Sequence, residues 1–325
     1  WLATEVLPAF GRPLRVVHSE PEWPFLGGME DRPVLNNSLV VAAGSVHGNA
    51  NFTSFRLPMY ARLLRARRAV NVGLLHLNQE LPCEVKEGSR RGTGCPYDIE
   101  HFVSDYRAFG YVLREYRSPT FAAHSAQLPL GPLSQALARR REPPRASARG
   151  GFCRAAFALS TLGYRMDRWH LHGNLTELGA ASPCVYTGRR LLREEYEEQL
   201  LDTTFSVCPF GNNPETYRLW ESVIMGAIVV TAPAAFIEEM EPRPPFLVLS
   251  SWRNLGPALE EFRRHPERAD ELQQRQQAWF REFKGLLHAR LRKLSEGAFG
   301  RAAAGPSTIA SPLPSIHQSM RPRCG

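Results

Sequence analysis

The chain has 325 residues, enough for two domains of ordinary size, and its 43% apolar content is typical of a globular protein. No run of 18 apolar residues occurs, so no segment of this sequence is predicted to span a membrane. The net charge of +8 comes from arginines scattered along the chain without a nucleic-acid-reader motif, which argues against nucleic acid as a partner.

The first half of the chain alternates apolar strands with helices. Strands are predicted at residues 14–17, 38–43, 70–77 and 111–116, and helices at residues 56–68 and 98–109. This order predicts an α/β domain with a parallel sheet over residues 1–140.

A proline- and arginine-rich segment at residues 139–150 follows, and we interpret it as a linker or exposed loop because its composition cannot build a core. Further strands are predicted at residues 152–159, 183–186, 203–210, 227–230 and 246–249, and helices at residues 164–171, 191–201, 214–225, 255–264 and 267–294. These elements predict a second α/β domain over residues 150–295 and a disordered tail over residues 296–325. The long last helix is expected to pack back on the first domain.

The turn between the strand at 203–210 and the next helix is the most informative stretch. Gly211, Asn212 and Asn213 form the turn, Pro214 is expected as the first helical residue, and Gly226 is expected to end the helix in a left-handed conformation. The turn lies at the carboxyl end of a strand, where open α/β sheets bind ligands. The free amides and positive dipole end of the helix suit a phosphate group.

Arg218 and Glu221 carry the charge of this helix, while Tyr217, Trp220 and Ile224 share the spacing of a core-facing stripe. An arginine in the first turn opposes the helix dipole, which a bound diphosphate would explain because a guanidinium grips two oxygens at once. Glu221 is then placed to accept two ribose hydroxyls. The competing interpretation is a surface Arg–Glu pair at i, i+3.

Together these residues form a motif: Cys208-Pro209-Phe210-Gly211, Glu215, Arg218-Leu219-Trp220-Glu221, Gly226 and the strand at 228–230. The motif resembles the donor site of exostosin-type glycosyltransferases, and most of all their ribitol xylosyltransferase branch. Weaker counterparts lie at residues 74–83, 128–131, 151–168, 184 and 246–259. The resemblance implies a GT-B fold, with two Rossmann-like domains whose parallel sheets face a cleft, and a nucleotide sugar held mainly by the second domain.

The resemblance also implies transfer of a sugar, with inversion, from a nucleotide sugar to a glycan or glycoprotein hydroxyl. The sequence contains no Asp-x-Asp motif for a divalent metal, so arginines and the helix N-terminus would carry the leaving-group charge, with no metal and no cofactor besides the donor. Arg168 matches an arginine of the family and is the expected second cation. Its competing interpretation is a solvated helix face in an arginine-rich chain.

The general base is expected in the first domain, in a loop at the carboxyl end of a strand. Glu80 lies three residues beyond Leu77, in a segment that resembles the corresponding family loop. His47 lies in a glycine-bearing turn and has the more convenient unperturbed pKa. We take Glu80 as the first candidate and His47 as the second.

The six cysteines show no zinc-binding spacing. Cys83 and Cys95 bracket a loop that a disulfide would close. Cys208, at the end of a strand, could form a disulfide or equally well be a buried free thiol. Sequons begin at Asn36, Asn51 and Asn174.

With the family resemblance, these features favour an enzyme of the Golgi or endoplasmic reticulum lumen. Because the sequence begins with Trp1, we expect a membrane anchor to lie outside it.

Two other classes remain as alternatives. A lectin-like or regulatory protein would keep the nucleotide-sugar fold without turnover, but the intact Arg218 and Glu221 argue against it. A phosphate-binding hydrolase would need a metal set or a nucleophile elbow, and the sequence has neither. A uridine diphosphate sugar is expected as donor, with xylose, glucuronic acid, galactose and arabinose all open.

Overall fold

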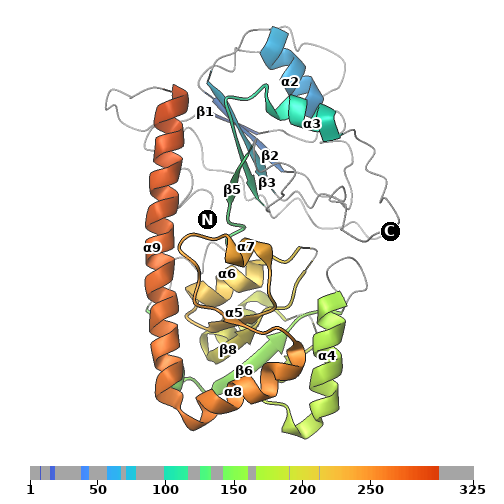
Figure 1. Ribbon diagram of the computed structural model, residues 1–325, viewed down its shortest axis with the longest axis vertical. Helices are drawn as coiled ribbons and strands as arrows, with labels where there is room; N and C mark the ends of the chain where they lie inside the picture. The colour runs from blue at the N-terminus through green and yellow to red at the C-terminus, as the bar shows by residue number, and fades with distance from the viewer. Residues whose placement is uncertain are drawn as a thin grey trace.

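In the computed structural model of this chain, the residues described are 8, 15–18, 38–43, 57–66, 71–77, 99–115, 125–132, 142–159, 166–189, 191–211 and 213–299. They form two parallel sheets connected by helices, which confirms the predicted α/β class (Figure 1). None of the described helices combines the length and the apolar character needed to cross a membrane.

The first sheet has the strand order β1-β2-β3-β4-β5 and all of its pairs are parallel. Its strands are β1 (Arg15–His18), β2 (Ser38–Ala43), β3 (Val72–Leu77), β4 (Tyr111–Glu115) and β5 (Ala126–Leu128). Helix α2 (Leu57–Ala66) leads to β3, and α3 (Ile99–Tyr106) leads to β4. Fully buried residues in its central strands fit a parallel sheet covered on both faces: Leu39, Val40, Leu74, Leu75 and Leu113.

The second sheet has the order β10-β9-β8-β6-β7 and is also parallel. Its strands are β6 (Gly151–Ala156), β7 (Val185–Thr187), β8 (Thr203–Val207), β9 (Ile228–Thr231) and β10 (Leu247–Val248). Its helices are α4 (Met166–Leu178), α5 (Arg193–Leu201), α6 (Tyr217–Ile224), α7 (Ala235–Glu238), α8 (Leu255–Arg264) and α9 (Pro266–Phe299). The chain runs from β6 to β7 on one side and then crosses to β8 on the other, so the strand order reverses between β6 and β8.

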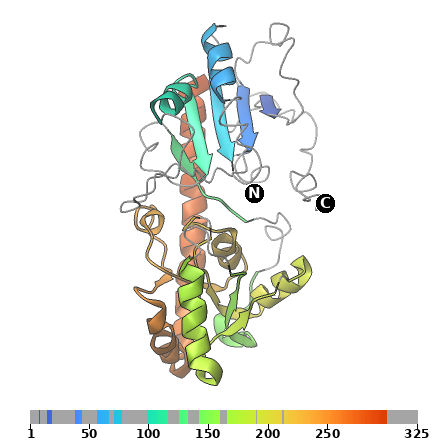
Figure 2. The same cartoon turned by 90° about the vertical axis from the view of Figure 1, so that its right-hand side faces the viewer.

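Helix α9 joins the two halves of the molecule. It extends beside both sheets in both views (Figures 1 and 2), and one buried cluster contains Leu113 of the first sheet, Trp220 of α6 and Leu291 of α9. The expectation that the last helix packs back on the first domain is confirmed. The predicted helix end at residue 294 is wrong, because α9 continues to Phe299. The rest of the predicted tail, residues 300–325, lies outside the described residues.

The segment at 139–150, predicted to be a linker or exposed loop, is partly core. Ala146 is buried, and its N–H donates a 2.9 Å hydrogen bond to Gln273 Oε1 of α9. Arg149 is buried as well and donates to the carbonyl oxygens of Thr203 and Met225, both at 2.8 Å. A charged guanidinium satisfied by backbone carbonyls therefore fixes the segment to the second domain.

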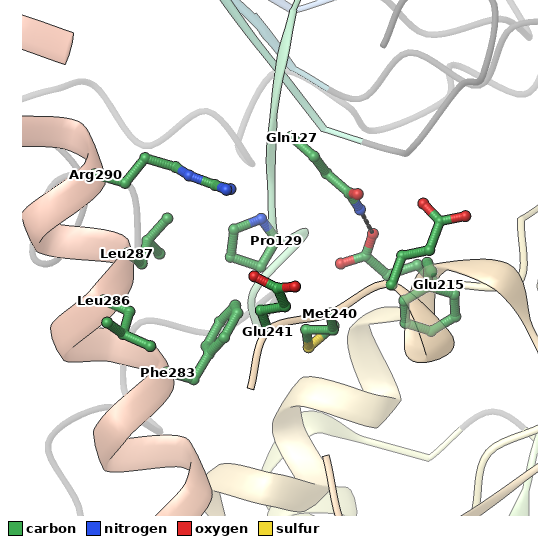
Figure 3. A pocket seen from close by; sticks show the side chains of 11 residues that line it. Gln127, Pro129, Glu215, Met240, Glu241, Phe283, Leu286, Leu287 and Arg290 are labelled. Carbon is green, nitrogen blue, oxygen red and sulfur yellow. Dashed lines mark hydrogen bonds between the residues drawn. The ribbon is translucent and has the colours of Figure 1, made fainter. Parts of the chain in front are cut away.

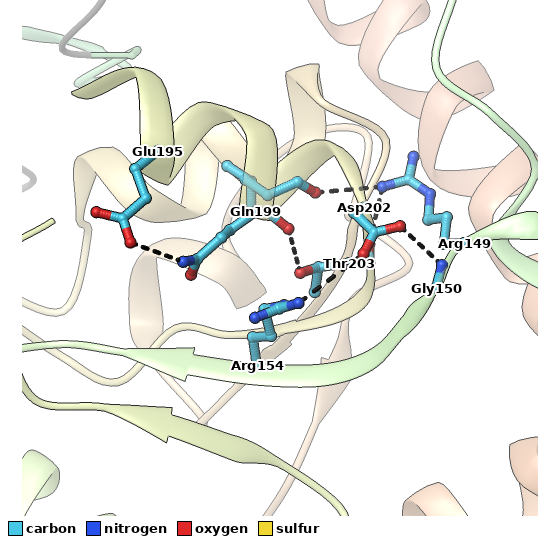
Figure 4. Close-up of polar contacts among 8 residues, drawn as sticks. Arg149, Gly150, Arg154, Glu195, Gln199, Asp202 and Thr203 are labelled. Atoms are coloured by element: carbon cyan, nitrogen blue, oxygen red, sulfur yellow. Dashed lines mark hydrogen bonds and ion pairs between the residues drawn. The ribbon is translucent and has the colours of Figure 1, made fainter. Parts of the chain in front are cut away.

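This attachment lies at the amino ends of β6 and β8. Gly150 N donates to Asp202 Oδ1 at 2.7 Å, and Arg154 lies 3.8 Å from the other carboxylate oxygen of Asp202 (Figure 4). Burial lowers the pKa of Arg149 to about 10, which leaves the group charged at neutral pH. The polar network thus stabilises the amino ends of the strands of the second sheet and leaves their carboxyl ends uninvolved.

The cysteine pattern was only partly predicted. Cys153 in β6 and Cys184, directly before β7, form a disulfide that their spacing did not suggest. Cys208 is a free, buried thiol, as one of the two interpretations had it. Cys83 and Cys95 lie outside the described residues.

The sequon at Asn174 lies on α4. Its side-chain Nδ2, the atom that a glycan would modify, donates a 2.8 Å hydrogen bond to the carbonyl oxygen of Trp252. The side chain of Asn174 is therefore engaged in a contact between α4 and the segment at Trp252. Asn36 and Asn51 lie outside the described residues.

Candidate functional site

The candidate site lies where the strand order of the second sheet reverses. The carboxyl end of β6 leads into α4, and the carboxyl end of β8 leads into residues 208–216, which we call the β8–α6 turn. Open α/β sheets bind ligands at such a switch point, because the two connections leave the sheet in opposite directions and open a crevice. The sequence predicted a site at the end of this strand, and the topology gives that position its physical reason.

Helix α6 begins later than predicted. Its first helical residue is Tyr217, after an extended Thr216, so Pro214 is not the first helical residue and Asn213 is not the cap. The end is as expected: Gly226 has φ +70° and follows the last turn of the helix. Trp220 faces the core with 1% exposure, and Tyr217 and Ile224 pack against the same cluster, as their spacing predicted.

The first turn of α4 holds the β8–α6 turn by its backbone. Asp167 Oδ2 accepts from Phe210 N at 2.9 Å, and Arg168 Nε donates to Phe210 O at 2.8 Å. The second oxygen of Asp167 accepts from Trp252 Nε1 at 2.6 Å. These contacts fix both polar groups of one peptide residue, so the path of the turn is set by α4 rather than by α6 alone.

Arg168 therefore reaches the place that the sequence predicted. A Cβ at Gly211 would lie 3.3 Å from Arg168 Nη2, so the guanidinium lies directly beside the turn. Arg168 Nη1 also donates to Ala158 O at 3.0 Å, so two sides of the guanidinium bind the protein's own carbonyls. The interpretation of Arg168 as part of a solvated helix face is wrong, because the group is half-buried and bonded to the turn.

Arg218 and Glu221 do not form the surface pair of the competing interpretation. Glu221 is only 7% exposed and accepts a 3.1 Å hydrogen bond from Tyr196 Oη of α5. Within the described part of the chain, Arg218 Nε is buried and has no hydrogen-bond partner, and no ion pair joins Arg218 to Glu221. Burial and the negative charge of Glu221 raise the pKa of Tyr196 well above its usual value, so Tyr196 remains a donor.

Two further buried polar atoms of the turn are in the same state as Arg218 Nε. Asn213 Nδ2 and Thr216 Oγ1 lack a hydrogen-bond partner among the residues that the structure describes. Buried polar groups in folded proteins are nearly always satisfied, so a cluster of exceptions at one turn calls for an explanation. Asn212 lies outside the described residues, and its predicted role stays a prediction.

Glu215 is a buried carboxylate whose contacts the sequence did not reveal. Its Oε1 accepts from Leu130 N at 2.7 Å and from Trp220 Nε1 at 2.8 Å, and its Oε2 accepts from Gln127 Nε2 at 3.3 Å (Figure 3). Burial raises the pKa of Glu215 to about 7 despite these hydrogen bonds. The only signal in the sequence was its place in the motif.

Glu80 and His47 lie outside the described residues. The strands that precede them, β3 and β2, are adjacent and parallel in the first sheet, so their carboxyl ends lie at the same edge. Both general-base assignments stay predictions. Among the described residues, no group of three or more His, Cys, Asp or Glu side chains could hold a metal ion.

Comparison with known proteins adds a family to this geometry. Residues 185–299, which contain the β8–α6 turn and α6, match the family model described as RXYLT1 C-terminal domain. Ribitol-5-phosphate xylosyltransferase 1 of Mus musculus is 26% identical over 125 residues, and the Homo sapiens protein is 26% identical over 128 residues. Each match covers 33% of this chain and 28% of the relative, so the chain spans about a quarter of the curated relatives it matches. The resemblance to the ribitol xylosyltransferase branch is confirmed for this part of the chain.

Solved structures show the fold. A UDP-forming α,α-trehalose-phosphate synthase from Burkholderia xenovorans has a TM-score of 0.52 at 14% identity, covering 81% of this chain and 74% of the other. Anabaena Alr3699/HepE in complex with UDP also has a TM-score of 0.52, at 13% identity, covering 80% of this chain and 78% of the other. The fold is GT-B, as the sequence resemblance implied.

Proposed function

We propose that this chain is part of a glycosyltransferase that moves a sugar from a nucleotide sugar to a hydroxyl of a glycan or glycoprotein. The observation that carries the proposal is a set of buried polar atoms on Asn213, Thr216 and Arg218. None of these atoms has a hydrogen-bond partner among the residues that the structure describes. A diphosphate at the switch point would supply acceptors for them and offset the cost of their burial. The match to the RXYLT1 C-terminal domain supports the reaction class.

A uridine diphosphate sugar is the donor that we propose. Alr3699/HepE, whose fold is similar, forms complexes with UDP and with UDP-glucose. The relatives named as ribitol-5-phosphate xylosyltransferase favour xylose among the sugars, and hence UDP-xylose.

In this proposal Arg218 binds the diphosphate leaving group. The negative charge on the diphosphate grows as the glycosidic bond breaks, and a preorganised cation stabilises it most in the transition state. Arg168 adds positive charge beside Gly211 while it shapes the turn through Phe210. Glu221, held by Tyr196, accepts the ribose hydroxyls.

The chemical step that we propose is a single in-line displacement. A general base, Glu80 or His47, takes the proton of the acceptor hydroxyl, whose oxygen then attacks the anomeric carbon as the diphosphate leaves. One displacement inverts the configuration of the sugar. We propose that the reaction requires no metal, since the sequence lacks Asp-x-Asp and offers Arg218 and Arg168 for the leaving-group charge.

We place the protein in the lumen of the Golgi or the endoplasmic reticulum. The Cys153–Cys184 disulfide supports an oxidising compartment, where such bonds form and persist.

Calorimetry with uridine diphosphate, with inorganic phosphate as the comparison, tests the donor site. We expect measurable binding of uridine diphosphate and none of phosphate at the same concentration. Equal heats for both would contradict the proposal. A screen of nucleotide sugars for release of the free diphosphate then tests turnover, and binding without sugar consumption by any donor would favour the non-catalytic alternative.

A further inference from the structure

Glu215 connects the candidate site to the first sheet. It belongs to the β8–α6 turn, yet two of its three donors come from elsewhere: Gln127 is in β5, and Leu130 is the second residue after β5. The third donor, Trp220, is in α6. The side chains in Figure 3 show the carboxylate of Glu215 directed at Gln127 across the junction between the two halves of the molecule.

A carboxylate is a costly choice for this position. Glu215 is only 4% exposed, and ionising a carboxyl group out of water is unfavourable unless strong partners compensate. Its hydrogen bonds return part of that cost, because bonds to a charged acceptor are shorter and stronger than neutral ones. The shortest is the 2.7 Å bond from Leu130 N, which fixes the chain after β5 against the turn.

We propose that Glu215 is a positioning residue that holds the β8–α6 turn in its donor-binding shape. It does so through its hydrogen bonds to Gln127 and Leu130 in the first half of the chain. The inference deepens the proposed function and rests on it. Glu215 lies three residues before Arg218, so the path of the chain at Glu215 sets where the guanidinium enters α6.

This arrangement has a thermodynamic consequence. If the Glu215–Leu130 hydrogen bond favours the binding shape of the turn, then a bound donor must favour that hydrogen bond by the same factor. Binding of the donor at the second sheet should therefore stabilise the hydrogen bond of the Leu130 amide, in the segment that follows the first sheet. With a purely structural carboxylate, the ligand would slow exchange at Leu130 only through global unfolding, as it does at every amide.

The first test compares variants by calorimetry with uridine diphosphate. Glu215→Ala should weaken binding about tenfold or more, the effect of leaving buried donors unpaired. Glu215→Gln should stay within about threefold, because its amide oxygen accepts from Leu130 and Trp220 while Gln127 turns its own amide to accept. Glu241→Gln is the matched control. Glu215 and Glu241 both line a cavity of about 280 Å³ between the turn and α9, but Glu241 makes no hydrogen bond to the turn among those the structure describes.

The second test does not depend on a variant that folds. Hydrogen exchange at the Leu130 amide is measured in the wild-type chain with and without saturating uridine diphosphate. We expect slower exchange with the ligand while the free energy of exchange at Leu130 lies below that of global unfolding, so that the slowing reports local opening. The same slowing is expected in Glu215→Gln.

Two results would overturn the inference and leave the proposed function standing. They are wild-type affinity in folded Glu215→Ala, and exchange at Leu130 that uridine diphosphate does not change. A wild-type chain that fails to bind uridine diphosphate would overturn the proposed function, and this inference with it.

Discussion

Arg218 and Glu221 lie one turn apart on α6 but have different surroundings, so their substitutions should affect turnover differently. Arg218 Nε is buried without a hydrogen-bond partner among the described residues, as expected of a group that awaits a ligand. Glu221 is already held by Tyr196 Oη. The first suits an interaction that strengthens in the transition state, and the second suits a preformed binding contact.

Arg218→Ala should lower kcat roughly 100- to 1000-fold, because loss of one preorganised donor costs about 3–4 kcal/mol of barrier. Glu221→Gln keeps the shape but weakens the proposed ribose contact, which is similar in ground and transition states. It should mainly raise KM for the donor. Steady-state kinetics on folded protein distinguishes the two effects.

Arg264→Ala is the control for loss of an arginine. Arg264 lies on α8, is 71% exposed and pairs only with Glu260 among the described residues, so its loss should leave the kinetics unchanged. Wild-type rates in both Arg218→Ala and Glu221→Gln would reduce α6 to a structural helix.

Glu215 should make stability depend on pH. Its folded pKa is raised from 4.5 to about 7, so the folded state loses stability as pH rises through this window and carries the full cost above pH 7. At about 1.4 kcal/mol per pKa unit, the cost is roughly 3 kcal/mol. Glu215→Gln removes the ionisation and should be more stable than wild type at pH 8.

The measurement is urea denaturation of both proteins at pH 5 and pH 8. The difference between them should be small at pH 5 and favour Glu215→Gln at pH 8. Buried His76, whose pKa is lowered, contributes equally to both and cancels. A difference that does not vary with pH would show that folding does not raise the pKa of Glu215.

At this scale the sequence identified residues better than it identified their partners. Arg168 was expected at the turn and lies there, but its bonds to Phe210 and Ala158 could not be predicted, because they depend on how α4 leaves β6. Tyr196 and Glu215 were missed as site residues for the same reason. Each makes its contact across a long sequence separation, which a motif does not record.

Among the elements, the end of α6 depends most strictly on a single residue. Gly226 has φ +70°, and a Cβ there would lie 2.6 Å from the Pro143 side chain and 2.8 Å from Arg149 Nη2. Alanine would add left-handed backbone strain of about 1–2 kcal/mol to this clash. Gly226→Ala should therefore lower the free energy of unfolding by at least about 2 kcal/mol.

Gly285→Ala provides a control of opposite sign. Gly285 is exposed in α9 with nothing near its Cβ position, so alanine should stabilise the helix by about 0.8–1 kcal/mol. Urea denaturation measures both variants. Equal effects of the two substitutions would contradict the argument from Gly226.

The element bounds show where local signals were enough. Long apolar or amphipathic stretches such as β2 and α8 were predicted to the residue, because periodicity and burial agree there. The three residues of β5 are too few to show a pattern. The start of α6 was misplaced because tertiary contacts outweighed a good capping sequence: Glu215 bonds to the first half of the chain, and the backbone is extended at Thr216 before the helix begins.

The molecule as a whole is joined by a core that the two sheets share. The cluster containing Leu113, Trp220 and Leu291 continues from the first sheet through α6 to α9, and the packing of Trp279 against Trp220 and Phe283 extends it along the helix. The sequence predicted two domains and a long last helix that packs back on the first domain. It could not predict how much of the core they share, since that depends on which face of α9 meets each sheet.

This shared core makes a prediction about cooperativity, with a control on the same helix. Leu291 is fully buried in the cluster, whereas Leu286 is 50% exposed. Leu291→Ala should cost about 2–5 kcal/mol, while Leu286→Ala should cost no more than about 0.5 kcal/mol. Because the cluster includes residues of both sheets, Leu291→Ala should shift a single unfolding transition of the whole molecule. It should not destabilise one half of the molecule alone.

Urea denaturation followed in parallel by tryptophan fluorescence and far-ultraviolet circular dichroism tests this. Trp220 and Trp279 lie in the shared cluster and report its loss, while circular dichroism reports the helices and sheets of both halves. The two signals should coincide in wild type and move together in Leu291→Ala. Separate transitions for the two probes, or equal costs for Leu286→Ala and Leu291→Ala, would mean that α9 does not couple the two sheets.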